Sequence, residues 1–170
     1  MFHHGLKKQT SSRGQKGVAI ILSPEFTKYY KLSGSKPLII PNNDSSEEFG
    51  RFLGIKLSFK TKVNFKGAFG KNKKKNKSQT INLFLSSVYH PVDEKDQLFF
   101  NNYLSSIYDS VPPNYVLMSG QDMNANIGVS KRKTDCKNIE TFGFDNRNKK
   151  GVEAVNLLRM DNFSAPLTFF

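Results

Sequence analysis

The sequence has no tryptophan and a single cysteine, and both shortages limit what the chain can be. Cys136 cannot form an internal disulfide, which fits a reducing compartment. It lies in a polar, lysine-rich stretch, and this favours a solvated thiol over a nucleophile. No apolar run reaches the roughly 18 residues of a membrane span, and no signal-peptide pattern opens the chain. We therefore expect a soluble intracellular protein, nuclear or cytoplasmic, with no membrane and no disulfide partner.

Acidic residues are missing between Lys60 and Gln79, where eight lysines stand. This segment supplies most of the formal charge of +12. The most closely spaced of these lysines are Lys71, Lys73, Lys74, Lys75 and Lys77. A lysine run is often only a solvated loop, but it also attracts polyanions and contacts phosphates without reading a base sequence. Charge alone leaves both interpretations open.

The chain of 170 residues is long enough for one domain with a core, although its hydrophobic content of 37% is low. We divide it into a polar, turn-rich segment, residues 1–16, and one domain, residues 17–170. His3 and His4 are neighbours in the first segment, but neighbouring side chains diverge in an extended chain. Because a metal site needs several converging ligands, this pair does not predict one.

Four stretches predict strands. Val18–Leu22 is continuously apolar, which is typical of a strand buried on both faces. Arg51–Lys60 alternates and predicts a strand with one wetter side, and Thr80–Tyr89 predicts its partner. The lysine-rich loop, residues 60–79, would join these two as an expanded hairpin, and long loops of this kind are often functional. Asn114–Met118 predicts a short buried strand.

Capping residues and periodicity predict the helices. Ser23, followed by proline and an acid, is a helix N-cap, so we expect a helix over Glu25–Leu32 that Gly34 closes. Asp93–Ser110 is the clearest amphipathic helix, and Gly151–Asp161 is a second one. In the first of these helices, over Asp93–Ser110, the expected core positions are Leu98, Phe99, Tyr103, Leu104, Ile107 and Tyr108. Strand, helix and strand in succession favour a mixed α/β arrangement.

An acid and an amide follow the strand over Asn114–Met118. Asp122 and Asn124 lie two residues apart, next to glycines that permit sharp turns. Polar side chains at the end of a strand suit chemistry at the rim of a sheet. The same pattern also describes an ordinary turn in which both side chains cap their own backbone. The segment by itself does not separate these alternatives.

Four stretches together resemble a known family. They are Gly17-Val18-Ala19-Ile20-Ile21-Leu22-Ser23, Ser87-Val88-Tyr89-His90-Pro91, Ser119-Gly120-Gln121-Asp122-Met123-Asn124-Ala125 and Leu167-Thr168-Phe169-Phe170. In this order they resemble the endonuclease/exonuclease/phosphatase superfamily, and most closely the endonuclease domain of non-LTR retrotransposons. The resemblance implies an α/β (α+β) fold, a four-layer sandwich of two mixed β-sheets flanked by helices. It also implies hydrolysis of DNA phosphodiesters with Mg²⁺ or Mn²⁺.

The resemblance assigns roles to single residues. Asp122 matches the acid that activates or positions the attacking water, and Asn124 matches the amide that orients the phosphate. Tyr89 matches the tyrosine that stabilises the phosphate oxygens. Thr168 lies in a stretch that lines the DNA-binding side of the retrotransposon enzymes. With DNA as the partner, we expect the closely spaced lysines to contact its backbone.

The chain also departs from the family pattern. The family has an asparagine and a glutamate, its main metal ligand, before the stretch that Gly17 begins, and a closing Ser-Asp-His. The 16 residues before Gly17 contain neither an acid nor an asparagine, and no Ser-Asp-His follows. Gln121 and Met123 replace the usual glycine and phenylalanine. We therefore expect an incomplete fold, truncated at both ends, with no assigned metal ligand and weak or no activity.

Two alternatives to the endonuclease stay open. A catalytically dead remnant would bind nucleic acid non-specifically through Lys60–Lys77, with an affinity that falls with salt. A phosphatase of the same fold would act on a phosphorylated lipid or small molecule. Nothing in the sequence indicates the oligomeric state.

Overall fold

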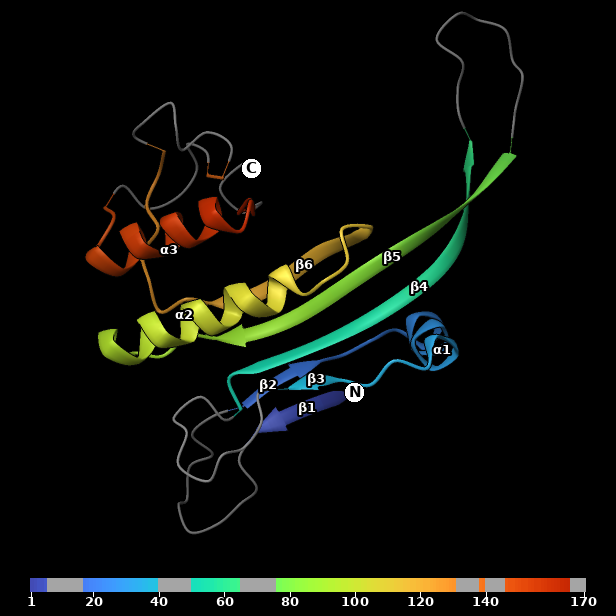
Figure 1. Ribbon diagram of the computed structural model, residues 1–170, viewed down its shortest axis with the longest axis horizontal. Helices are drawn as coiled ribbons and strands as arrows, with labels where there is room; N and C mark the ends of the chain where they lie inside the picture. The colour runs from blue at the N-terminus through green and yellow to red at the C-terminus, as the bar shows by residue number, and fades with distance from the viewer. Residues whose placement is uncertain (6–16, 40–49, 65–75, 131–137, 140–145, 166–170) are drawn as a thin grey trace, which may run out of the picture.

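The computed structural model describes residues 1–5, 17–39, 50–64, 76–130, 138–139 and 146–165 (Figure 1). In these residues the chain is mixed α/β, with two sheets and three helices. The strands are β1 (Phe2–Gly5), β2 (Gly17–Ile20), β3 (Leu38–Ile39), β4 (Phe52–Asn64), β5 (Asn76–Tyr89) and β6 (Tyr115–Asp122). The helices are α1 (Pro24–Ser33), α2 (Glu94–Asp109) and α3 (Lys149–Met160).

Several residues named above lie outside the described residues. They are Lys71, Lys73, Lys74, Lys75, Cys136 and Thr168. The backbone of Lys77 belongs to β5, but its side chain is not among those described.

The larger sheet has the strand order β3-β4-β5-β6. β4 pairs antiparallel with β5, and β5 pairs parallel with β6. A parallel neighbour requires a crossover connection, and α2 supplies it. The predicted strand–helix–strand unit and the predicted pairing of the two long strands are thereby confirmed. The smaller sheet consists of β1 and β2, which pair antiparallel.

Both faces of β4 and β5 are buried along the first half of β4. On one face Phe52, Phe84 and Val88 pack against Phe100 and Leu104 of α2. The opposite face packs against α1 and the β1–β2 sheet through a second cluster, which includes Ile55, Leu57, Leu83, Leu85, Tyr30, Phe26, Phe2 and Ile20. The larger sheet is thus the middle layer, with α2 on one side and β1, β2 and α1 on the other (Figure 1).

α1 forms as its capping residues predict. Ser23 is the N-cap, and its hydroxyl accepts a hydrogen bond from the Phe26 amide at 3.3 Å. Gly34 ends the helix with a φ of 64°, a left-handed conformation in which glycine meets no Cβ penalty. Local chemistry therefore fixes both ends of this helix.

The N-terminal region differs from the prediction in two ways. Phe2–Gly5 forms a strand, in a segment that we expected to be polar and turn-rich over residues 1–16. β2 is not buried on both faces, since Ala19 is exposed and Ile21 is 78% exposed. The β1–β2 sheet covers the larger sheet with one face only, so side chains that point the other way meet solvent.

β6 is an edge strand rather than a buried one. Among the described residues it pairs only with β5, and its side chains alternate between half-buried and exposed. Val116 is 54% and Met118 is 56% exposed. The apolar composition was typical of a buried strand, but the β1–β2 sheet does not extend far enough to cover this face.

The buried face of α2 is also displaced from the prediction. Leu98 and Phe99 are 68% and 62% exposed, whereas Gln97 and Phe100 are buried. Leu104, Ile107 and Tyr108 are buried as predicted; their confirmed positions continue the helical spacing that Phe100 begins. Apolar residues on both sides of the helix made the periodicity ambiguous at its beginning.

The lysine-rich segment is not a loop over its whole predicted length. Residues 60–64 and 76–79 belong to β4 and β5, so the strands continue well beyond the sheet core. The alternating pattern hid this extension because lysine, threonine and serine stand where core residues would mark a strand. The remaining part of the predicted loop, residues 65–75, lies outside the described residues.

We predict that Leu104→Ala lowers the free energy of unfolding by about 2–5 kcal/mol, because it empties volume in a packed core. The matched control is Leu98→Ala on the same helix, which should change it by no more than about 0.5 kcal/mol. Urea denaturation followed by circular dichroism measures both. Equal effects of the two variants would show that the helix buries the other face.

Candidate functional site

Tyr89 and Asp122 lie at the carboxyl ends of two neighbouring parallel strands. They are paired in the register of β5 and β6, and Asn124 follows two residues later. Parallel strands bring their carboxyl ends to one edge of a sheet, which is where polar side chains from separate strands can meet a common ligand. The structure therefore brings together all three catalytic residues predicted from the sequence.

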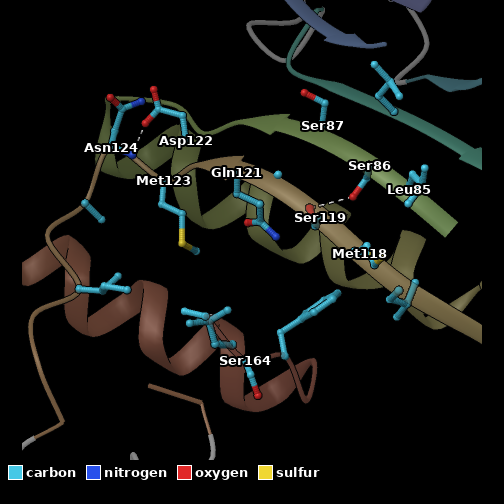
Figure 2. A pocket seen from close by; sticks show the side chains of 18 of the residues that line it. Leu85, Ser86, Ser87, Met118, Ser119, Gln121, Asp122, Met123, Asn124 and Ser164 are labelled. Carbon is cyan, nitrogen blue, oxygen red and sulfur yellow. Dashed lines mark hydrogen bonds between the residues drawn. The ribbon is translucent and has the colours of Figure 1, made fainter. Parts of the chain in front are cut away.

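The chain turns sharply after Asp122. The Asn124 amide donates to Asp122 Oδ1 at 3.1 Å, and Asn124 has a φ of 47°. This is the self-capping turn that we considered, and Asp122 remains exposed while it caps. Asn124 reaches back to β5, because its Nδ2 donates to the His90 carbonyl at 2.8 Å. Figure 2 shows the two side chains next to each other at the end of β6.

Backbone contacts lock the ends of the two strands together. The His90 amide donates to the Asp122 carbonyl at 2.8 Å, and the Tyr89 amide donates to the Arg51 carbonyl at 2.8 Å. The Tyr89–His90 segment is therefore held from both neighbouring strands. Asp122 and Tyr89 keep their relative position through main-chain bonds rather than through their own side chains.

Arg51 is a residue of this site that the sequence did not reveal. It is buried, and its Nη1 donates to the His90 carbonyl at 3.3 Å and to the Tyr89 carbonyl at 3.5 Å. Its guanidinium carbon lies 5.2 Å from the centroid of the Tyr89 ring. The cation is thus held against both carbonyls and the aromatic face of Tyr89. A single arginine before a strand carries no signal of such a role.

His90 is fully buried behind this edge. Its Nε2 lies 2.9 Å from Gln121 Oε1, and its ring meets Phe100 edge-to-face at 5.3 Å. Gln121 Nε2 donates to the Tyr108 hydroxyl at 3.4 Å, so Gln121 Oε1 is left to accept from the histidine. His90 therefore carries its proton on Nε2 when it is neutral.

The hydrogen-bond network continues beneath β6. The Tyr108 hydroxyl lies 3.0 Å from Ser119 Oγ and 3.2 Å from Ser86 Oγ, and Ser86 donates to Ser119 at 2.8 Å. Burial raises the pKa of Tyr108, although its bonds to Ser119 and Ser86 oppose this. These side chains connect α2, β5 and β6 and hold β6 on the side opposite to its open edge.

Burial lowers the pKa of His90 below its ordinary value of 6.5. Its hydrogen bonds with Gln121 and Asn101 and the charge of Asp122 act in the opposite direction, and the charge of Arg51 lowers the pKa further. Desolvation is the largest cause, so we expect a neutral imidazole near pH 7.

α3 clamps the loop that follows the Asp122–Asn124 turn. Asn148 Oδ1 accepts from the Gly151 amide at 2.7 Å as the N-cap of α3, and also from the Asn126 amide at 3.2 Å. Arg147 donates from Nε to the Ile127 carbonyl at 2.7 Å. A Cβ at position 151 would lie 1.8 Å from the Asn126 carbonyl oxygen, so the helix approaches the loop through glycine.

A cavity of about 1000 Å³ adjoins Asp122 and Asn124. It follows the open edge of β6, and its walls come from β2, β5, β6, the loop after β6 and the end of α3. Figure 2 shows Asp122 and Asn124 at one end of it and Met118 and Leu85 towards the other. Its lining is mainly apolar, so the polar site opens onto an apolar wall.

The described residues do not form a metal cage. No group of three or more histidine, cysteine, aspartate or glutamate side chains lies within metal-binding reach in the described part of the chain. His3 is exposed and His4 buried on β1, which confirms that the two side chains diverge. Among the described residues at the site, Asp122 supplies a carboxylate and Asn124 an amide oxygen. Mg²⁺ held by the protein needs more hard oxygen ligands than this pair supplies.

Two lysines of the basic segment, Lys60 and Lys62, have side chains that the structure describes, and both lie towards the other end of the β4–β5 pair. Lys62 pairs with Ser78, and Ser78 to Tyr89 spans about 36 Å of extended strand at roughly 3.3 Å per residue. The structure thus separates these basic residues from Asp122.

Comparison of the chain with protein-family models, with curated proteins and with solved structures gave no match. In the part of the chain that the structure describes, no helix has the length and apolarity needed to cross a membrane.

We predict that Gly151→Ala lowers the free energy of unfolding by about 1–3 kcal/mol, because the added methyl group overlaps the Asn126 carbonyl. In the middle of a solvent-exposed helix, glycine to alanine would raise the free energy of unfolding by about 1 kcal/mol. The sign of the change therefore shows whether the helix is in tight contact with the loop. Val152→Ala, an exposed neighbour on the same turn, serves as the control and should have little effect. Denaturant unfolding decides the matter, and a stabilised Gly151→Ala would contradict the tight contact.

We predict that the stability of the protein falls as the pH falls below about 6.5, in part through His90. Unfolding restores the ordinary pKa of 6.5, so below it the unfolded chain binds a proton that the folded chain, with its lowered pKa, does not. The contribution of His90 to the free energy of unfolding is complete above pH 6.5. It declines as the pH falls from 6.5 towards the pKa of His90 in the folded protein, by at most about 1.4 kcal/mol per pH unit.

The measurement is urea unfolding between pH 7.5 and pH 5 for wild type and His90→Gln. The variant should depend less on pH than wild type. His3→Gln, an exposed histidine on β1, should keep the wild-type dependence. The pKa of His4 is lowered by burial and, to a smaller extent, by the charge of His3, so His4 contributes in the same direction. This contribution cancels between wild type and His90→Gln, and His3→Gln removes only its smaller cause. Identical pH profiles for wild type and His90→Gln would contradict the prediction.

Proposed function

We propose that the protein is a phosphodiester hydrolase of the DNA endonuclease type, with Mg²⁺ or Mn²⁺ as its cofactor, and that its turnover is slow. The observation that carries the proposal is the convergence of Tyr89, Asp122 and Asn124 at the carboxyl ends of β5 and β6. These are the residues that the resemblance to the endonuclease/exonuclease/phosphatase superfamily singles out. The four-layer sandwich of that family is part of the same proposal.

The chemistry of the residues suits an attack of water on phosphorus. An exposed carboxylate at Asp122 can position a water molecule and accept its proton. The Tyr89 hydroxyl and the Arg51 charge are suited to stabilise negative charge on the phosphate oxygens. Asn124, held by the His90 carbonyl, fixes the direction in which the acid points. Preorganised donors of this kind contribute to catalysis without reorganisation during the reaction.

Slow turnover follows from the ligand set. The described residues provide one carboxylate at the site, which is fewer hard oxygen ligands than Mg²⁺ held by a protein needs. Losing one member of a catalytic constellation commonly costs several orders of magnitude in rate. We therefore expect phosphodiester cleavage that depends on Asp122 and is slow but measurable.

A second candidate function is nucleic-acid binding without catalysis. This candidate is favoured because Lys60 and Lys62 lie far from Asp122. Basic residues at that distance can bind nucleic acid without taking part in cleavage. A third candidate is a phosphatase acting on a phosphorylated lipid or small molecule. It is favoured by the mainly apolar cavity beside Asp122. Faster turnover of an inositol phosphate or a sphingolipid head group than of DNA would support this third function.

We predict that the full chain nicks supercoiled plasmid slowly in the presence of Mg²⁺ and that chelator abolishes the nicking. Asp122→Asn should remove this activity, because the substituted amide cannot take up a proton from water. Agarose-gel electrophoresis of the plasmid over time measures the rate.

The matched control is Asp109→Asn, which neutralises an exposed carboxylate at the end of α2 and should leave nicking unchanged. Circular dichroism confirms that both variants are folded. Nicking that survives Asp122→Asn would contradict the assignment of the site. A folded protein that nicks no plasmid with either metal would contradict the hydrolase and leave the second and third candidates.

A further inference from the structure

The two longest strands continue beyond the rest of the sheet as a ribbon. β6 pairs with β5 only from Asn82 onward, whereas β4 and β5 stay paired out to Asn64 and Asn76. Residues 58–64 and 76–82 therefore form a projecting two-stranded arm, which curves away from α2 and β6 in Figure 1. We call it the β4–β5 arm.

α1 supports one face of the arm. The Phe59 ring packs against Phe26 at 5.5 Å edge-to-face and stacks on Tyr29 at 5.3 Å, as measured between ring centroids. Side chains alternate along a strand, so the neighbours of Phe59 point to the opposite face. The aromatic contacts with α1 fix which face of the arm is turned outward.

The outward face is polar and basic. It carries Ser58, Lys60 and Lys62 from β4, and opposite the two lysines stand Thr80 and Ser78 from β5. Lys60, Lys62, Thr80 and Ser78 are exposed. The sequence from Lys56 to Asn64 and from Asn76 to Phe84 contains no acid. The lysines are therefore spaced on alternate residues, with hydroxyl donors across from them and no acid in either strand of the arm.

Side-chain bonds hold the base of this face. The Ser58 hydroxyl donates to Asn82 Oδ1 at 2.7 Å, and Asn82 Nδ2 donates to the Asn114 carbonyl at 3.3 Å. Lys56 lies on the same face, with its Nζ 5.9 Å from the centroid of the Tyr115 ring. These contacts tie the arm to β6, so its outward face is shaped before a ligand arrives, which lowers the entropic cost of binding.

We propose that this outward face, made by Lys56, Ser58, Lys60, Lys62, Ser78 and Thr80, is a docking surface for the backbone of duplex DNA. The major groove of B-DNA, about 12 Å wide, admits a two-stranded ribbon. Lysines and hydroxyls are groups that contact phosphates in such complexes. Lys56 to Lys62 spans about 20 Å of extended strand, which matches roughly six base-pair rises.

The chemistry of the face favours nucleic acid over an anionic membrane. The side chains that the structure describes on this face of the arm belong to lysine, serine, threonine and asparagine, and none of these is an apolar group that would enter the acyl boundary of a bilayer. The surface lies far along β5 from Asp122, so it goes beyond the proposed hydrolysis and specifies the second candidate function. Binding here requires neither the cleavage site nor a metal ion.

The test is fluorescence anisotropy of a labelled 20-base-pair DNA duplex with the full chain, in EDTA, at salt concentrations from 50 to 200 mM. We expect binding that weakens as salt rises. Lys60→Gln/Lys62→Gln should weaken binding roughly tenfold at 0.1 M salt and reduce the slope of log K against log salt by about 2.

The matched control is Lys28→Gln/Lys31→Gln, which removes the same charge from exposed lysines of α1. This control should keep the wild-type slope. Equal weakening by both double variants would overturn the proposal, because attraction would then follow the total charge. Unchanged binding by Lys60→Gln/Lys62→Gln would also overturn it, as would arm-dependent binding to phosphatidylserine vesicles without binding to the duplex. If the protein binds the duplex but does not nick plasmid, the proposed hydrolase activity is wrong and the docking surface stands.

Discussion

The antiparallel pairing of β4 with β5 is the constraint on which the other parts of the structure depend. It runs without interruption from Phe52 opposite Val88 to Asn64 opposite Asn76. At one end both faces of the β4–β5 pair are buried. One face packs against α2, and the other packs against α1 and the β1–β2 sheet. The same end presents Tyr89 and His90 to β6, while the far end leaves the core as the arm. A single register therefore sets the core, the candidate site and the basic surface.

The candidate site is held by backbone bonds and by hydrogen bonds of buried side chains. Asn124 and Arg51 share the His90 carbonyl, and the His90 amide binds Asp122. Hydrogen bonds inside a protein are electrostatically stronger than in water, and these bonds specify one arrangement. This explains how an exposed acid at an edge strand keeps a defined position. The Gln121 side-chain amide joins the same network, which continues to Tyr108.

Expectations based on local chemistry were confirmed, and those that depended on distant partners were less reliable. The Ser23 cap, the Gly34 stop and the end of β5 at His90 follow from hydrogen bonding and backbone preference within a few residues. The burial of Val18–Leu22 and of the strand after Asn114 depended on a covering layer, and there the prediction was wrong. In α2 the outward Leu98 and Phe99 had the same local pattern as core residues. Arg51 and the His90 network gave no signal, because their partners lie 30 or more residues away.

The sequence by itself determined the helix ends, the pairing of the two long strands and the crossover to β6. Each of these rests on short-range rules, on alternation and on the obligation of a parallel strand to have a crossover. The choice of Tyr89, Asp122 and Asn124 rested instead on the order of four short motifs. Only the tertiary structure decided which faces are covered, that β6 is an edge and that the basic segment projects far from Asp122. Burial is a property of what packs against a residue, and register fixes distance along a ladder, so neither can be read from composition.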